Sequence, residues 1–281
     1  MDLFFDRESS KSPTVRKYRD LLYGLHGDLA WLLHSRAEQS SEGGSIGLED
    51  LKTEVARYID AQGADAALTD ELFQGVMERI FALVATRQER FEFEVQPLRE
   101  FFAAHHLYST AQVSTLGVSR PGTRADRFDA MARDAFWLNV VRFYAGFYAS
   151  GELPSLADCL EALADDPDFA LTDHPRTLTA LLVADWSFSL DRRSRERAIQ
   201  VCLAGCGHRH ILGTRREIVT LPEGSGRAEV VAACLRRLRD EGVDKLDRKR
   251  MLELALARHI DEGTFTSEVR DVVRATSGTD R

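Results

Sequence analysis

The sequence is poor in the residues that mark several large classes of protein. Its 281 residues include four cysteines and seven prolines. So few cysteines do not form a disulfide scaffold, and we interpret them as reduced thiols in a cytoplasmic protein. No apolar run approaches the roughly 18–20 residues that a membrane-spanning helix needs. The N-terminal residues MDLFFDRE lack the basic and apolar regions of a secretory signal, so we expect neither a leader nor a membrane segment.

Two common catalytic signatures are also missing. The sequence has no Gly-x-x-x-x-Gly-Lys-Ser/Thr run, whose amides and lysine would cradle phosphates. The nearest glycine-rich segment, LPEGSGR at residues 221–227, lacks the lysine and follows no predicted strand. There is no Gly-x-Ser-x-Gly nucleophile elbow either. We therefore expect that the chain is not an enzyme by itself and holds no cofactor.

The charge balance limits the classes of partner that the chain can bind. Asp and Glu number 45 against 37 Lys and Arg, a formal net charge of −8, which argues against a general nucleic-acid-binding surface. Two segments are nevertheless basic, RRSRER at residues 192–197 and a longer one at residues 236–250. They could meet phosphates or an acidic partner. The acids interleaved with them favour a solvated, salt-bridged helix face.

Helical periodicity is what the sequence has in abundance. Apolar residues recur at spacings of three and four, which predicts helices within residues 14–40, 48–63, 69–84 and 97–107. From residue 126 onward, shorter helical patterns alternate with breaks, as in a HEAT-type helical-repeat array. No internal sequence repeat accompanies them, so an irregular helical bundle is the alternative.

One segment predicts a strand. Residues 91–95, FEFEV, alternate apolar and acidic side chains, and Pro97 then suits the first turn of a helix. A strand needs a partner, which the sequence does not identify. We expect a mainly α protein with a winged-helix-like region at residues 1–110, a linker at 111–125 and a helical-repeat region, an irregular α-solenoid or bundle, at 126–281.

One cluster combines residue types that bind zinc. Cys202, Cys206, His208 and His210 form a Cys-x3-Cys-x-His-x-His pattern. A helix through residue 206 would put both thiols on one face, and the histidines could fold back after Gly207. Cys202 also belongs to an apolar face. We favour two core thiols beside a polar turn and predict no metal site, with this cluster as the zinc candidate.

The segment FEFEVQPLREFFAA at residues 91–104 resembles the end of the winged-helix region in NACHT-type STAND NTPases. There an aromatic strand leads into a helix with a Glu-aromatic-aromatic-Ala-Ala signature. Glu100 matches the motif acid, and we place it in the first helical turn, where a carboxylate is favoured. Val95 stands where members often carry a nucleotide-sensing histidine. The motif residues are Phe91, Phe93, Pro97, Glu100, Phe101, Phe102, Ala103 and Ala104.

The resemblance implies a function as well as a fold. The chain would be the C-terminal winged-helix and helical sensor part of a bacterial STAND protein without its P-loop ATPase core. It would pack on a P-loop ATPase module, bind a protein trigger through its helical region and license oligomerisation, in signalling or antiphage defence. Two alternatives remain open, a free-standing helical-repeat scaffold with no nucleotide link and a small zinc-stabilised helical protein.

Overall fold

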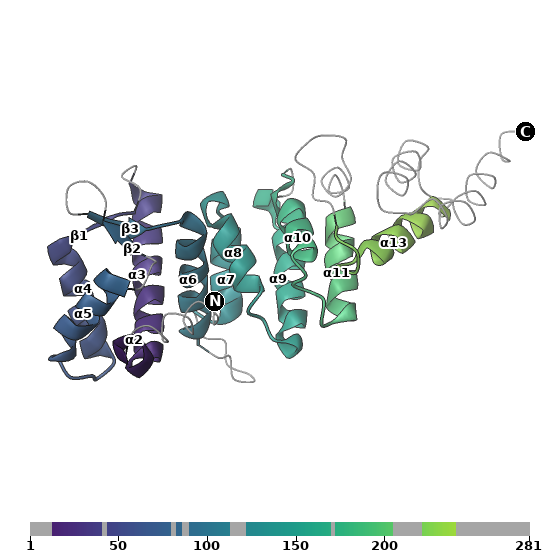
Figure 1. Ribbon diagram of the computed structural model, residues 1–281. Coiled ribbons are helices and arrows are strands. Elements are labelled where there is room, and N and C mark those ends of the chain that lie inside the picture. The colour runs from purple at the N-terminus through teal and green to yellow at the C-terminus, as the bar shows by residue number, and fades with distance from the viewer. Residues whose placement is uncertain are drawn as a thin grey trace, which may run out of the picture. The chain divides into compact units, whose positions relative to one another are not determined.

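The computed structural model describes residues 13–40, 44–79, 83–85, 90–112, 122–169, 172–204 and 221–239. These residues are mainly helical with three short strands, so the predicted fold class is confirmed (Figure 1). None of the helices in these ranges is both long and apolar enough to cross a membrane. The chain forms two compact units, Met1–Phe147 and Tyr148–Arg281.

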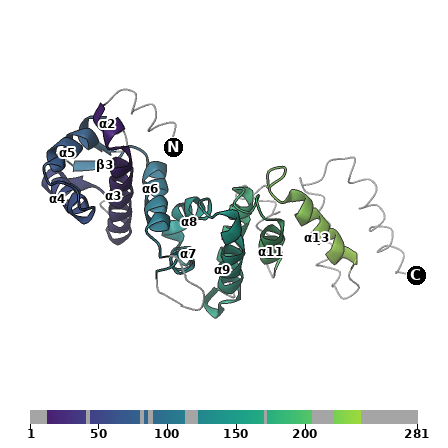
Figure 2. The same ribbon diagram turned by 90° about the horizontal axis from the view of Figure 1, so that it is seen from below.

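The first unit has a winged-helix-like order of elements. β3 is the central strand of a three-stranded antiparallel sheet with the order β1-β3-β2. Ile46 pairs with Phe91 on one side of β3, and Leu83 pairs with Phe93 on the other. Figure 2 shows β3 among the helices of this unit. The elements are α2 (Pro13–Lys17), α3 (Arg19–Gln39), β1 (Ile46–Gly47), α4 (Leu48–Ala61), α5 (Leu68–Arg79), β2 (Leu83–Ala85), β3 (Arg90–Phe93) and α6 (Gln96–Ser109).

The two partner strands lie where the sequence predicts no strand. β2 spans Leu83–Ala85, so the prediction of a helix continuing to Val84 is wrong. α5 ends at Arg79 among the described residues. A short apolar run fits a helix face and a buried strand equally well, because periodicity cannot separate them over so few residues. β1 has two residues, which is too few for any alternation.

The core of the first unit forms between α3 and α6. The α3 residues Leu22, Leu25, Leu29 and Leu33 are fully buried. On α6, Phe102, Ala103 and Ala104 are buried in turn. A Cβ added at Gly27 of α3 would lie 3.2 Å from the Cβ of His106, so the two helices approach closely there. Small residues at the contact permit this approach.

Two further helices complete the first unit, α7 (Arg124–Ala132) and, after a 3-10 turn at Ala135–Trp137, α8 (Leu138–Ala145). Thr123 and Asp126 form a capping box at the start of α7. Arg127 then donates to the carbonyl oxygen of Leu107 at 2.6 Å, which joins α7 to the end of α6. The predicted linker 111–125 lies largely outside the described residues, and this unit continues beyond the predicted boundary at residue 110 to Phe147.

The second unit consists of short helices. α9, α10 and α11 pack on one another, and α13 packs on α11. Gly226, just before α13, has a φ of +137°, and a Cβ there would lie 3.1 Å from methyl carbons of Ile199 and Val183. Helices predicted beyond residue 239 lie outside the described residues. The helices are α9 (Leu153–Asp165), α10 (His174–Ala184), α11 (Arg192–Leu203) and α13 (Arg227–Arg239), with 3-10 turns at Ser150–Glu152 and Pro167–Phe169.

Candidate functional site

The motif residues meet at the junction between β3 and α6. Phe91 and Phe93 are buried, as period-two alternation along β3 predicts. The Phe93 ring lies 6.2 Å from the ring of Phe102, which also meets Tyr23 of α3 edge-on at 5.4 Å. Pro97 lies in the first turn of α6. The junction therefore joins the sheet to both α3 and α6 through aromatic contacts.

Phe101 and Phe102 are adjacent but contact different neighbours. Successive residues of a helix point about 100° apart. The Phe102 ring faces Tyr23 and the sheet, while the Phe101 ring meets Phe143 and Phe147 edge-on at 5.7 and 5.6 Å. The pair thus binds α6 to the sheet and α3 in one direction and to α8 in the other.

Glu100 is a buried carboxylate between α6 and α8, with 3% of its surface exposed. Its Oε1 accepts hydrogen bonds from Nε2 of Gln96 at 2.8 Å and from Nδ2 of Asn139 on α8 at 3.3 Å. α6 begins at Gln96, so the prediction that Glu100 lies in the first helical turn is wrong. A buried acid needs partners, and here side-chain amides from two helices supply them in place of the helix dipole.

Two buried histidines of α3 lie near this junction. His34 packs between the rings of Phe136 and Trp137, each 4.6 Å away, and neither of its ring nitrogens has a hydrogen-bond partner among the described residues. Burial, with the charge of Arg99, lowers the pKa of His34 to about 4. Burial likewise lowers the pKa of His26 to about 4, although His26 Nδ1 donates to the Leu22 carbonyl at 2.7 Å. A single histidine in an apolar stripe gives no sequence signal, and our sequence analysis missed both.

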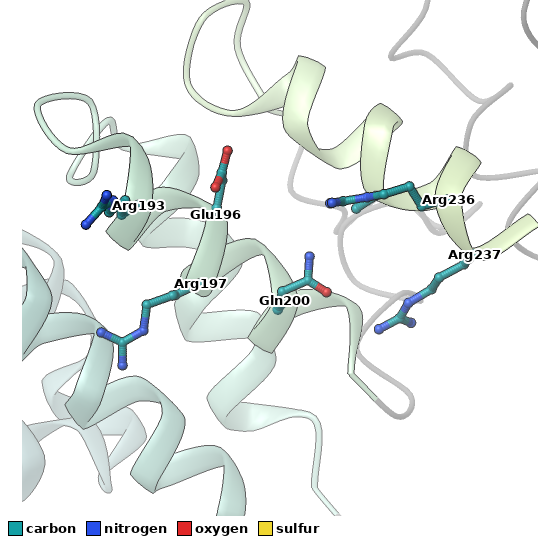
Figure 3. Close-up of a pocket in the computed structure, with 7 residues that line it drawn as sticks. Arg193, Glu196, Arg197, Gln200, Arg236 and Arg237 are labelled. Atoms are coloured by element: carbon teal, nitrogen blue, oxygen red, sulfur yellow. The ribbon is translucent and has the colours of Figure 1, made fainter. Parts of the chain in front are cut away.

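The second unit contains a basic groove between α11 and α13 (Figure 3). Its volume is about 600 Å³. Arginines of both basic segments meet there, the first on α11 and the second on α13. We call this the α11–α13 groove, and it is lined by Arg193, Glu196, Arg197, Gln200, Ala233, Arg236 and Arg237.

Much of the first basic segment is salt-bridged. Arg197 binds Asp158 and Glu161 of α9, with an Nε–Oε1 distance of 2.8 Å to Glu161, and these acids raise its pKa. Arg195 binds Glu229 of α13 at 2.6 Å, and both side chains are largely buried. The predicted exposed pairing with an interleaved acid is confirmed for Arg192, which binds Glu196 at 2.9 Å, whereas Arg195 and Arg197 pair with acids of other helices. Arg193 and Arg236, by contrast, have no hydrogen bond or ion pair from their side chains to the rest of the described chain.

The zinc candidate is described at one position. Cys202 lies on α11 with 1% of its surface exposed, and burial raises the pKa of its thiol well above the usual value. Cys206, His208 and His210 lie outside the described residues, so the zinc cluster stays untested. Within the ranges that the structure describes, no three His, Cys, Asp or Glu side chains come together as metal ligands.

Comparisons with protein-family models, with curated proteins and with solved structures gave no match to the chain. The resemblance to NACHT-type STAND proteins therefore depends on the sequence itself, most sharply on residues 91–104. In the structure, these residues form the junction at which the sheet, α3 and α8 meet α6.

Proposed function

We propose that the chain is a regulatory and sensing portion of a bacterial STAND (NACHT-like) signalling or antiphage defence system. It acts in the cytoplasm through protein–protein contacts, with a P-loop ATPase module as its partner, and performs no catalysis by itself. The observation that carries the proposal is the junction at β3 and α6, where the family-like residues contact both the winged-helix-like sheet and α8.

The junction suits a part that passes a binding event from one neighbour to another. α6 contacts α3 through the Phe102 ring and α8 through Phe101 and Glu100. A trigger that binds one packing arrangement of these helices better than another shifts the equilibrium between them. The shift cannot exceed the difference in binding free energy of the trigger for the two arrangements. Exposure of a surface for oligomerisation would follow from that shift.

The test begins with the natural locus on both sides of the reading frame. We expect it to encode a P-loop ATPase, which is then co-expressed with the full chain. A stable complex on size exclusion and a changed ATP hydrolysis rate are the expected results. A partner ATPase that neither binds the chain nor changes its rate on addition of the chain would overturn the proposal.

A matched pair of variants sharpens this test. Phe101→Ala removes a ring contact between α6 and α8, and it should reduce the effect on the ATPase rate while the complex still forms. Leu190→Ser, in an exposed turn of the second unit where the residue is 72% exposed, is the control and should leave the rate unchanged. Equal rates for wild type and Phe101→Ala would remove the junction from the mechanism.

A free-standing helical scaffold is the second candidate. It is favoured by the second unit, in which short successive helices pack on one another. Such arrays present extended surfaces to partners without any nucleotide. A locus without an ATPase gene would make this candidate the leading one.

A further inference from the structure

We propose that the α11–α13 groove binds a small phosphate-bearing molecule, with Arg236 and Arg237 as the main contacts to the phosphate group. The inference does not depend on the function proposed above, because it concerns only the second unit. Four guanidinium groups line the groove against the single carboxylate of Glu196. This excess of positive charge favours the binding of an anion in the groove.

Side chains from the two helices converge at one end of the groove. In Figure 3, Arg236 extends from α13 toward α11, and the Gln200 amide extends from α11 toward α13, with Arg237 beside them. An anion bound between them would therefore receive hydrogen bonds from both helices. This is the arrangement of a site rather than of a single charged helix face.

Arg237 is held in place before any ligand arrives. Its Nη1 donates to the carbonyl oxygen of Leu203 at 2.7 Å, at the end of α11. Carbonyl groups at a helix C-terminus lack partners within the helix, and they attract positive charge. One N–H of Arg237 is used in this way, which orients the planar guanidinium group and leaves its other N–H groups for a ligand.

The remaining charges determine where the anion binds. Arg197 is neutralised by Asp158 and Glu161, and Glu196 is paired with Arg192 at 2.9 Å. Arg236 has no ion pair to any described residue. Unneutralised charge therefore lies on Arg193 of α11 and on Arg236 and Arg237 of α13. The side chain of Arg193 points away from α13 (Figure 3), so the charge that an anion between the two helices would meet is that of Arg236 and Arg237.

The size of the groove favours a small ligand that carries a phosphate or diphosphate group. Its volume of about 600 Å³ lies within the range of small-molecule sites. The planar guanidinium group donates two parallel hydrogen bonds to two oxygens of one phosphate. This geometry favours phosphate over a monatomic anion such as chloride. Glu196 lies on the same groove, so a long polyanion along its whole length would meet a carboxylate.

The experiment is calorimetric titration of the full chain with inorganic phosphate, pyrophosphate and adenosine diphosphate, at low and at raised salt. We expect binding that weakens with salt, and a stronger signal for pyrophosphate than for phosphate. Arg236→Gln should weaken binding about tenfold, the loss of one charge-assisted hydrogen bond. Arg236→Lys keeps the positive charge but loses the planar guanidinium group. Its affinity should therefore lie between those of the wild type and Arg236→Gln.

The control variant is Arg133→Gln, which removes an equal charge from an exposed ion pair with Asp129 in the first unit. It should leave the binding unchanged. Equal weakening by Arg133→Gln and Arg236→Gln would overturn the site, because net charge alone would then explain the binding. No binding of any of the three probes to the wild-type chain would overturn it as well.

A last arm separates small molecules from nucleic acid. A short DNA duplex is titrated into the same proteins. We expect no binding that depends on Arg236. Duplex binding that Arg236→Gln abolishes, with no response to pyrophosphate, would replace the proposed ligand by a nucleic acid backbone. The thermal melting of each variant, measured without ligand, verifies that the fold is intact.

Discussion

The α3–α6 interface and the α11–α13 interface both join two helices, but they differ in the polarity of the side chains that line them. In the first unit, leucines, alanines and aromatic rings bring α3 and α6 so close that a Cβ at Gly27 would make a tight contact with His106. In the second, arginines line the space between α11 and α13, and a groove remains. Apolar side chains fill the first interface, whereas the second combines buried apolar residues with charged side chains that line the groove. One interface therefore supplies stability and the other space for a ligand.

Removing a fully buried ring from the apolar interface should have the largest effect. Phe102 is 1% exposed and contacts rings on the sheet, on α3 and on α6 itself. Phe102→Ala should lower the free energy of unfolding by about 3–5 kcal/mol, the cost of a large cavity in a packed core. Urea unfolding measures it. A loss below about 1 kcal/mol, the size of a typical surface change, would refute the role of this ring in the core.

Acid should weaken the packing of α3 through its two buried histidines, each by less than the loss of Phe102. His26 and His34 have folded pKa values of about 4, below the ordinary 6.5 of the unfolded chain. The unfolded state thus binds protons that the folded state refuses, so stability is complete above pH 6.5 and falls as the pH drops toward 4. Each histidine should cost up to about 2 kcal/mol at pH 5.

The check is urea unfolding at pH 7, 6 and 5 for wild type and for His34→Phe. A phenylalanine keeps the ring packing against Phe136 and Trp137 but cannot titrate. The variant should lose less stability than the wild type between pH 7 and pH 5. Identical slopes would mean that His34 is already protonated, or open to water, in the folded protein.

The smallest effects should come from the charged interface. Arg195 and Glu229 are largely buried, so Arg195→Ala should cost about 1–2 kcal/mol, between the values for exposed and buried pairs. Arg192→Ala, which breaks a well-exposed pair with Glu196, should cost at most about 0.5 kcal/mol. Both are measured by thermal unfolding. Equal losses would show that burial does not separate the two pairs.

Apolar periodicity and the positions of glycine and proline could predict most of the helices and the central strand, because those elements are long or strongly alternating. Ile46–Gly47 and Leu83–Ala85 could not be predicted, since strands of two or three residues have almost no pattern of their own. They form strands because they pair with the two sides of β3. This pairing is a tertiary interaction, and it overrides the helical signal at Val84.

The candidate sites divide in the same way. The motif at residues 91–104 and both basic segments are visible in the sequence, because they are contiguous. The hydrogen bond from Asn139 to Glu100 and the convergence of Gln200 with Arg236 are not, because each depends on two helices that meet only in the folded chain. The sequence therefore identified the charged residues of the groove, but neither Gln200 and Ala233 nor the groove itself.

Gly226 fixes the start of α13. The backbone before the helix is fixed against Ile199 and Val183, at a φ that few residues other than glycine adopt. Arg236 lies ten residues further along, about 15 Å at the usual helical rise. A tilt of about 5° at the glycine would then move the Arg236 guanidinium by about 1.3 Å. The position of Arg236 in the groove therefore depends on how closely the backbone at Gly226 approaches Ile199 and Val183, a contact that a side chain at Gly226 would disturb.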